Sequence, residues 1–515
     1  MSEAGEALAK WLGMDRRPDP PGPVLLTVGG LLMLAAMVIA IADPWKVVVL
    51  LVSVAVIAAA FARPTWVILF LALYSPFEPF LLKFVPDNLY IYARYFSEGL
   101  IYILLVSVAL RLFVRDRRLV ATPLDLPFVF FILVALTSII VNAVPPVYGL
   151  LGVRQIIRFI LLFFLTVYLD PDTPFIKRVT NFMFVIVLFQ GVLGFLQSVI
   201  GAPLDEFLIP SERKFYESIQ LTTGTTQFWS PGSRVFATLG RYDQLGTFLC
   251  FFFLLAVGLI YCTKQREDRR RLLVPILVAL PAFILTLSRA SWFGFALAFF
   301  VIGAVLMKDS KVRFAYAGAV ALALIYLGVT GITVRYLVDY PEQTVAERFF
   351  EAFSYERWRG EYYGLGRLFW IVQTPLVVVR SSPLFGVGPG QFGGGAVAAL
   401  GNTAVYEKLN LPFGVYGTGG YIDNNWFSLW GETGTLGLAF YAWMIFALAW
   451  MALTVMRESK DPYVKGLALG YFGCVLAVSF QAFLATYFEV RTIALYLWLY
   501  GSFVYVLARR EKIYA

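Results

Sequence analysis

The sequence predicts an all-α polytopic membrane protein, and three observations support this fold class. Of the 515 residues, 60% are hydrophobic, 17% are aromatic and only 15% are charged. The mean hydropathy is +0.75. A soluble protein of this length could not bury so much apolar surface, so much of that surface must face lipid. About 14 apolar stretches are each long enough to cross the hydrocarbon core of a bilayer as a helix, when the chain is read with a window of about 19 residues.

The predicted spans fall into three groups along the chain. We expect helices at residues 24–42, 46–62, 65–82, 97–114, 126–143, 150–169, 179–200, 244–263, 272–288, 291–307, 314–332, 426–455, 464–487 and 491–508. The charged, proline-rich stretch before the first span is not typical of a signal peptide, and it is predicted to be a short amphipathic cytoplasmic segment. The resulting division is 1–23 cytoplasmic segment, 24–200 N-terminal membrane helices, 201–243 first outer loop, 244–332 central helices, 333–425 large outer loop, 426–508 C-terminal helices and 509–515 cytoplasmic tail.

Basic residues in alternate loops predict the orientation of these helices. Cytoplasmic loops of membrane proteins carry an excess of Lys and Arg. Such stretches are RDRR (115–118), KQREDRRR (264–271), KDSKVR (308–313), RESKDPYVK (457–465) and ARREK (508–512). We therefore expect both termini in the cytoplasm of a bacterium and both long loops on the outer face of its inner membrane. The net charge of +9 then reflects topology, and a nucleic-acid partner is not expected.

The large outer loop at 333–425 is predicted to fold over the membrane face as a small lid. A loop of this length is usually either functional or disordered, and this one is too aromatic for a disordered segment. Helix-like patterns occur at ERFFEAFSYERWRGEYY (347–363) and at 366–381.

The chain contains no histidine, which removes several kinds of chemistry at once. Histidine general bases, histidine-ligated metals and histidine pH switches are all excluded. The cysteines Cys250, Cys262 and Cys474 lie in or beside apolar runs, so we expect packing residues rather than disulfides. The outer loops contain no Asp-x-Asp or His cluster, so neither a metal nor a cofactor is expected.

Arginine is frequent in the predicted outer loops, against the usual sidedness of basic residues. Its fixed fork of donors suits phosphate oxygens, and its charge is permanent. Some of these arginines alternate with acids at helical spacing, which favours salt bridges within the loop; these are Arg348, Arg357 and Arg359. Others have no acid close in sequence, which favours a lipid phosphate or diphosphate as partner; these are Arg234, Arg289 and Arg367.

Two further features have competing interpretations. The glycines of SSPLFGVGPGQFGGG (381–395) could present backbone amides to an anion, or they could form a plain turn. They do not belong to a βαβ unit, so no dinucleotide-binding motif is indicated. Asp423 either caps the helix predicted to begin near residue 426 or takes part in a site. Glu432, farther along that helix, is predicted to be structural.

Four stretches, in this order, resemble the O-antigen ligase and Wzy-type polymerase superfamily. They are SRVFATLGRYDQLGTFL (233–249), LTLSRASWFGFALAFF (285–300), GRLFWIVQTPLVVVRSSPLFGVGPGQF (366–392) and DNNWFSLWGETGTLGL (423–438). Each is loose alone, but four in order within a protein of many helices are fairly specific. The resemblance implies a membrane glycosyltransferase with a GT-C-like fold. Its donor would be a sugar chain on a polyprenyl diphosphate, used at the outer face of the inner membrane.

The resemblance also implies roles for individual residues. Members of the superfamily carry arginines thought to hold the donor diphosphate, and the positions here are Arg234, Arg241, Arg289 and Arg367. The ligase branch has a His-Asn pair before the ETG helix, whereas this chain has Asp423 and Asn424, as is common in the polymerases. An attacking hydroxyl needs a base, and without histidine Asp423 is the candidate, with Asn424 beside it.

The leading hypothesis is therefore an inverting, metal-independent glycosyltransferase that polymerises undecaprenyl-diphosphate-linked repeat units. The partners implied are the lipid-linked oligosaccharide, the bilayer and a chain-length regulator. An O-antigen ligase that transfers the glycan to a lipid A core or another acceptor is the alternative, and the Asp-Asn pair favours the polymerase. From another class, a transporter or flippase stays open, although such proteins often place paired charges near the bilayer midplane.

Overall fold

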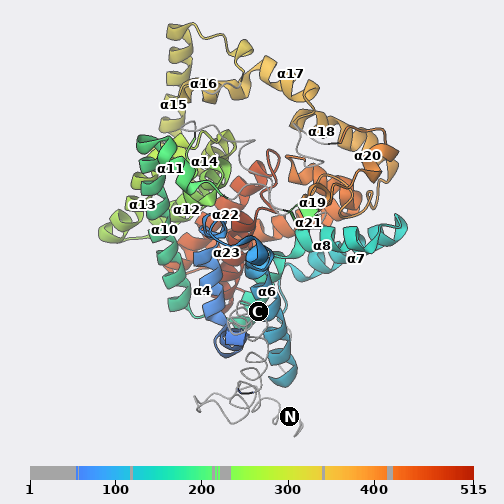
Figure 1. Cartoon of the computed structure of the whole chain (residues 1–515). Coiled ribbons are helices and arrows are strands. Elements are labelled where there is room, and N and C mark those ends of the chain that lie inside the picture. The colour runs from blue at the N-terminus through green and yellow to red at the C-terminus, as the bar shows by residue number, and fades with distance from the viewer. Residues whose placement is uncertain are drawn as a thin grey trace.

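The chain forms a helical bundle with a helical arch at one end (Figure 1). The computed structural model describes residues 30, 54–55, 57–115, 120–210, 215–216, 219–220, 234–338, 343–413 and 422–514. Several predicted features lie wholly or partly outside these residues: the segment 1–23, the spans 24–42 and 46–62, the basic stretch 115–118 and much of the loop 201–243. In the described residues the only strands are a two-residue hairpin, β1 (Phe215–Tyr216) with β2 (Ile219–Gln220). The all-α prediction is confirmed for this part of the chain.

Eight helices in the described residues are long and apolar enough to cross a membrane. They are α6 (Asp87–Arg115), α10 (Thr173–Ile200), α12 (Tyr242–Cys262), α14 (Arg289–Phe300) continued by η2 (Val301–Leu306), α15 (Ser310–Thr330), α21 (Asn425–Glu458), α22 (Pro462–Gln481) and α23 (Arg491–Arg510). A ninth is obtained if α8 (Pro146–Ile157) and α9 (Ile160–Leu169), bent by 53°, form one span. The chain is thus a multi-pass membrane protein, while the count of about 14 spans stays a prediction.

Other predicted spans appear as shorter helices. The span predicted at 65–82 is divided into α4 (Pro64–Tyr74) and α5 (Glu78–Leu82), with Pro76 in the break and Pro79 in the first turn of α5. The spans predicted at 126–143 and 272–288 are α7 (Asp125–Val141) and α13 (Arg266–Leu285). Charged residues fill the start of α13, which shortens its apolar part. Between the helices lie α11 (Ala202–Leu208) and η1 (Ala237–Leu239).

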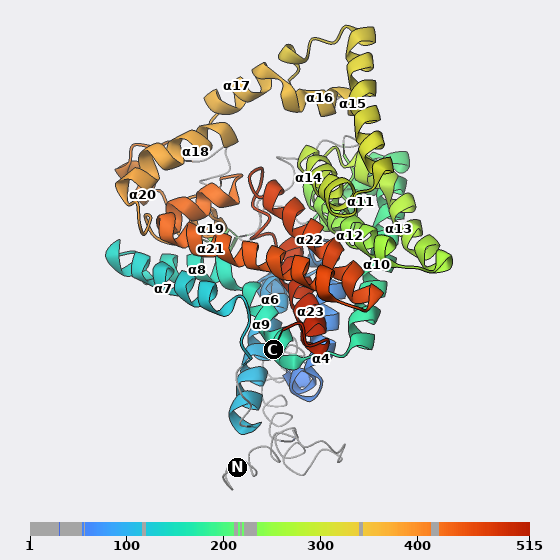
Figure 2. The same ribbon diagram turned by 180° about the vertical axis from the view of Figure 1, so that it is seen from behind.

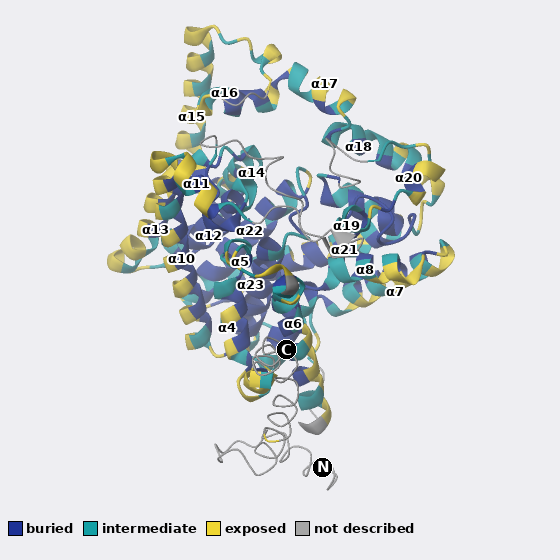
Figure 3. Ribbon diagram, viewed as in Figure 1, coloured by how far each residue is buried: buried dark blue, intermediate teal, exposed yellow. Residues whose placement is uncertain are grey.

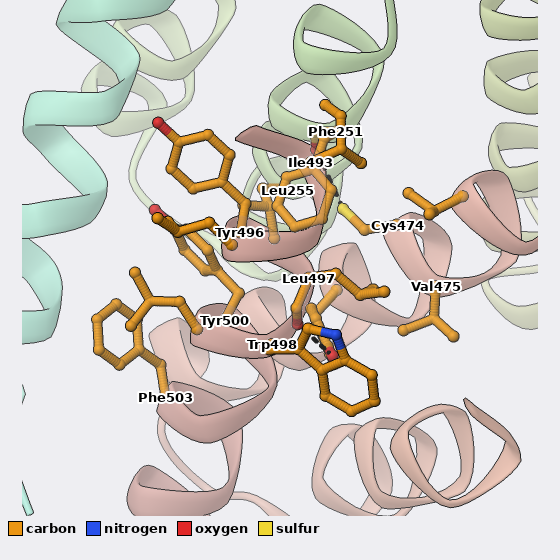
Figure 4. Packing of buried hydrophobic residues seen from close by; sticks show 14 of the residues in the cluster. Phe251, Leu255, Cys474, Val475, Ile493, Tyr496, Leu497, Trp498, Tyr500 and Phe503 are labelled. Carbon is orange, nitrogen blue, oxygen red and sulfur yellow. Dashed lines mark hydrogen bonds between the residues drawn. The ribbon is translucent and has the colours of Figure 1, made fainter. Parts of the chain in front are cut away.

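The centre of the bundle is built from α12, α22 and α23. Small residues allow the first two to approach closely, since a side chain on Gly258 would overlap the backbone of Gly470. Figure 4 shows Phe251 of α12, Cys474 of α22 and Tyr496 of α23 packed together in this core. Large apolar side chains remain exposed on outer helices such as α7, α10 and α15 (Figure 3). Because a bilayer accepts such surface, this distribution fits a membrane-embedded bundle.

Where the structure describes the large loop predicted at 333–425, more than half of the residues lie in short helices. These are η3 (Val334–Tyr336), α16 (Val345–Phe350), η4 (Glu351–Phe353), α17 (Tyr355–Tyr363), α18 (Arg367–Gln373), η5 (Thr374–Val379), α19 (Gly395–Leu400) and α20 (Ala404–Lys408). Both helix-like patterns in the sequence therefore form helices. Figures 1 and 2 show α16, α17 and α18 as an arch that leads from α15 towards α20. A small aromatic core of Trp370, Phe392 and Tyr406 holds the far end of this arch together.

A break in α21 positions the glycine segment 386–394. Gly434 has φ 69° and ψ −172°, a conformation open almost only to glycine, and it divides the helix in two. The freed amides of Thr435 and Leu436 donate to the carbonyls of Pro383 and Leu384, at 2.9 and 3.2 Å. In return, the amides of residues 387 and 388 donate to the carbonyls of residues 431 and 432, both at 2.9 Å. The preceding segment thus satisfies the backbone groups that the break exposes.

Candidate functional site

Asn424, not Asp423, caps α21. The Asn424 Oδ1 accepts a hydrogen bond from the amide of Phe427 at 3.1 Å. The interpretation of Asp423 as the helix cap is therefore wrong, because the helix begins one residue earlier than predicted. Asn424 is fully buried, and its Nδ2 has no hydrogen-bond partner among the described residues. This buried donor is therefore available to a group or a water molecule that binds there.

Asp423 faces an arginine of the large loop. The Asp423 Oδ2 lies 3.5 Å from the Arg367 Nη2, and the Asp423 side chain is 36% exposed. The amide of Arg367 donates to the Glu361 Oε2 at 3.0 Å, which fixes the start of α18. Burial alone would lower the pKa of Arg367, but the charges of Asp423 and Glu361 raise it above its ordinary value. The Arg367 Nε is buried without a hydrogen-bond partner.

Arg289 belongs to a group of three arginines around one carboxylate, which we call the Glu351 cluster. The Glu351 side chain is fully buried and lies 2.7 Å from the Arg289 Nη1, 2.9 Å from the Arg348 Nη1 and 2.8 Å from the Arg357 Nε. Arg357 also pairs with Glu361. Even when Glu361 is counted, the three guanidinium groups exceed the carboxylates by one. The cluster therefore keeps a positive charge at low exposure, where anions are held strongly.

A continuous series of contacts joins Arg289 to Asp423. It runs from Arg289 to Glu351, Arg357, Glu361, Arg367 and Asp423. The loop acids do pair with arginines of the loop as expected, since Arg359 also lies 3.6 Å from Glu356. Arg289 has an acidic partner as well, which its local sequence did not indicate because Glu351 comes from the distant η4.

The other two predicted arginines lie at the start of α12. The guanidinium of Arg234 lies over the ring of Tyr242, 4.4 Å from its centroid. Arg241 forms a two-pronged ion pair with Asp243, at 3.1 and 3.2 Å. Tyr242 is also within electrostatic range of Arg367.

The glycine segment does surround a carboxylate, and that carboxylate belongs to the chain itself. The amide of Gly390 donates to the Glu432 Oε1 at 3.0 Å. Glu432 is buried beneath the segment, and a side chain on Gly394 would lie 3.1 Å from the same oxygen. Glu432 therefore holds the loop beside the break in α21, which agrees with the structural role predicted for it.

Glu489 is a site residue that the sequence did not single out. It lies in the turn between α22 and α23, and its Oε1 accepts from the Asn425 Nδ2 at 3.1 Å. Its Oε2 accepts from the amide of Gly395 at 3.2 Å and the Gln155 Nε2 at 3.3 Å. Burial raises the pKa of Glu489 against the effect of these donors. The sequence signal that could have indicated Glu489 is its position, because it is an acidic residue in a short turn between two predicted spans.

Residues 274–442 match a family model described as O-antigen ligase. This part of the chain is similar to the O-antigen ligase family. This confirms the resemblance to the O-antigen ligase and Wzy-type polymerase superfamily that four stretches of the sequence indicated. The matched residues include Arg289, Arg367, Asp423, Asn424 and Glu432, and the match ends shortly after the break in α21. A comparison with curated proteins found no match to the chain.

The matched residues 274–442 therefore include the whole contact series from Arg289 to Asp423. Arg234 and Arg241 lie before them, and Glu489 lies after them. Among the residues that the structure describes, no three His, Cys, Asp or Glu side chains come together as metal ligands. The arrangement supplies one carboxylate that is open to solvent, a neighbouring arginine and a positive cluster, which together suit the transfer of a group from an anionic leaving group.

Proposed function

We propose that the chain is an integral membrane glycosyltransferase that polymerises undecaprenyl-diphosphate-linked glycan repeat units on the outer face of the inner membrane. The observation that supports this most is the surroundings of Asp423. Two buried donors without hydrogen-bond partners adjoin it, the Arg367 Nε and the Asn424 Nδ2. Such donors suit oxygens of a sugar diphosphate beside a carboxylate that can accept a proton.

The proposed reaction is a single displacement with inversion. Asp423 takes the proton from an acceptor sugar hydroxyl as its oxygen attacks the anomeric carbon of the donor. The bond between that carbon and the diphosphate oxygen breaks, and its electron pair leaves with the lipid diphosphate. Arg367 and Arg289 stabilise the negative charge that develops on the leaving group, so no acid is needed to protonate it. No step requires a metal or a cofactor.

Arg234 and Arg241 are assigned to the same donor. Arg234 stacks on Tyr242, which is near Arg367, so both arginines can flank the diphosphate from the start of α12. In this proposal, residues 333–425 act as a lid over the membrane face and bring Arg367 and the Glu351 cluster to Asp423.

A ligase is the second candidate, because the matching family model is described as O-antigen ligase. The two activities differ in their acceptor alone: another lipid-linked repeat unit for the polymerase, and a lipid A core for the ligase. Asp423 stands where the ligase branch has histidine, and this difference favours the polymerase.

The product pattern tests the proposal. Purified protein in lipid nanodiscs is given a radiolabelled undecaprenyl-diphosphate repeat unit, with or without a lipid A core. A ladder of lipid-linked oligomers without the core is expected. A single transfer that occurs only with the core would identify a ligase. Movement of the lipid across proteoliposomes with no new glycosidic bond would instead identify a flippase.

A further inference from the structure

A second group of arginines is joined to the start of α21 through Glu489. We call it the Arg94 cluster. Its arginines come from α6, from α8 and the bend that follows it, and from the start of α23. Three acids lie among them. The members are Arg94, Arg154, Arg158 and Arg491, with Glu78, Glu98 and Glu489.

Ion pairs hold three of the four arginines in place. Glu98 accepts from the Arg154 Nη2 at 2.6 Å and lies 3.4 Å from the Arg158 Nη1. The Arg491 Nη1 lies 2.7 Å from the Glu78 Oε1. Their side chains are therefore fixed before any ligand arrives, which reduces the entropy lost on binding.

Tyr95 and Glu489 extend this arrangement. The guanidinium groups of Arg154 and Arg491 both lie over the ring of Tyr95, 4.9 and 5.8 Å from its centroid. The Arg158 Nη2 donates to the backbone carbonyl of Glu489 at 2.9 Å, and the Glu489 side chain reaches Asn425. The cluster is thus connected to the residues that follow Asp423.

The Arg94 cluster contains more guanidinium groups than carboxylates, so some of its donors are not used by its own acids. Arg94 makes no side-chain hydrogen bond or ion pair with the described residues, although it lies within electrostatic range of both Arg491 and the Glu78 that pairs with it. The Arg158 side chain is 6% exposed, yet its Nε has no hydrogen-bond partner. A buried cationic donor without a partner, such as the Arg158 Nε, is unfavourable unless an anion completes its contacts. Arg154, with 28% of its side chain exposed, leaves the cluster accessible from the surface.

We propose that the Arg94 cluster binds a second lipid-linked diphosphate, the one that carries the acceptor sugar. This inference rests on the proposed function, because a polymerase must hold two lipid-linked glycans at once. Two diphosphates repel each other, so each requires its own cations. Asp423 contacts Arg367 of the first group, and Asn425 contacts Glu489 of the second. The proposed base therefore lies between a donor site and an acceptor site.

Arg94 gives the clearest variant. It has no ionic partner of its own, so Arg94→Gln leaves no acid unpaired and removes repulsion with Arg491. A purely structural cluster would be unaffected or stabilised by this change. A binding site would lose a charge-assisted contact and about tenfold or more in affinity. Arg178→Gln, at an exposed arginine of α10, is the matched control.

Binding is measured by native mass spectrometry of the full chain in detergent, with sugar-free undecaprenyl diphosphate as the probe. The wild type and Arg178→Gln are expected to bind two lipids. Arg94→Gln should bind one at the same concentration, and Arg94→Lys should recover part of the second. The inference is wrong if the wild type binds one lipid, or if Arg94→Gln still binds two with wild-type affinity. Displacement of the second lipid by equimolar phosphatidylglycerol would show a general phospholipid site and overturn the assignment to the acceptor.

The two proposals fail in different ways. An acceptor analogue with a methylene in place of the anomeric oxygen cannot act as a donor, so it separates the two substrates kinetically. Arg94→Gln should raise the KM of this acceptor analogue about tenfold or more and leave the KM of the donor unchanged. Two bound lipids without any glycan transfer would reject the proposed function and retain the site. Transfer with an unchanged acceptor KM in Arg94→Gln would reject the acceptor site and retain the function.

Discussion

The two polar ends of the Asn424 side chain have different environments. Its Oδ1 caps α21, whereas its Nδ2 is buried without a partner. The cap is an ordinary local stabilisation of the helix start. The free donor adds nothing to the fold and is available to a sugar or phosphate oxygen next to Asp423. One side chain therefore links the helix start to the proposed chemistry.

Substitutions at Asn424 separate these two roles. Serine also caps helices and stays neutral when buried but lacks the amide donor, so Asn424→Ser should keep most of the melting temperature and lose about tenfold or more in kcat. Asn424→Ala should lose both activity and stability, with about 1 kcal/mol of the free energy of unfolding lost with the cap. Thermal unfolding and the polymerisation assay check the pair. Full activity in Asn424→Ser would mean that the residue is a cap only.

The Glu351 cluster is expected to depend strongly on its one carboxylate. Glu351→Gln would leave Arg289, Arg348 and Arg357 without their shared counter-charge, and the loss of a buried partner costs about 3–5 kcal/mol. Glu356→Gln breaks a more exposed pair with Arg359 and should change stability by about 1 kcal/mol or less. Equal melting temperatures for the two variants would contradict the role given to Glu351.

Sequence alone could identify these residue types but not all of their partners. Arg289 and Arg367 stood out because basic residues are unusual in the predicted outer loops. The pairing of Arg289 with Glu351 depends on how the loop folds back over α14, which local spacing does not encode. The cap of α21 proved to be Asn424 rather than Asp423 for a similar reason, since a helix start is uncertain by one or two residues until the cap is seen.

At the scale of elements, the break in α21 and the segment before α19 form one unit. Gly434 frees backbone groups, residues 383–388 pair with them, and Glu432 holds the glycines that follow. Periodicity predicted one continuous helix over 426–455, because a single glycine does not interrupt an apolar pattern. The spans with uniform apolar sequence, such as α10 and α12, were predicted to within a few residues at most ends.

Gly434→Ala tests this unit. A Cβ at this position would overlap the backbone of Leu384 and Gly386, and the φ of 69° is strained for any L residue. We expect a loss of at least about 1–3 kcal/mol and a lower yield of folded protein. Gly318→Ala, in α15, has open space around it and should be neutral or slightly stabilising. Fluorescence-detected size-exclusion chromatography after heating compares the fraction of each variant that stays folded. Equal fractions for Gly434→Ala and Gly318→Ala would contradict the structural role of the break in α21.

At the scale of the whole molecule, the described contacts gather the basic loops at one end of the bundle and the proposed site at the other. Tyr261 donates to Asp309, Ser459 donates to Glu511, and Arg510 pairs with Asp170. The grouping is the one that the sidedness of Lys and Arg predicts for a cytoplasmic face.

Single cysteines test this orientation in a chain whose own three cysteines are replaced by alanine. Tyr363→Cys in the arch should react with a membrane-impermeant maleimide in cells whose outer membrane is permeabilised. Glu267→Cys in the basic loop should react only after the inner membrane is opened as well. The reverse labelling pattern would place the arch in the cytoplasm, where a lipid-linked donor on the outer face could not reach it.

The central claim is that Asp423 accepts the proton in glycosyl transfer, and Asp423→Asn tests it most directly. Asn retains the shape of the side chain, and Asp423 does not cap α21, so folding should be unaffected. With purified protein and saturating lipid-linked repeat unit, kcat should fall by about 10²–10⁴-fold while undecaprenyl diphosphate still binds. An unchanged kcat in Asp423→Asn, with an unchanged melting temperature, would contradict the account.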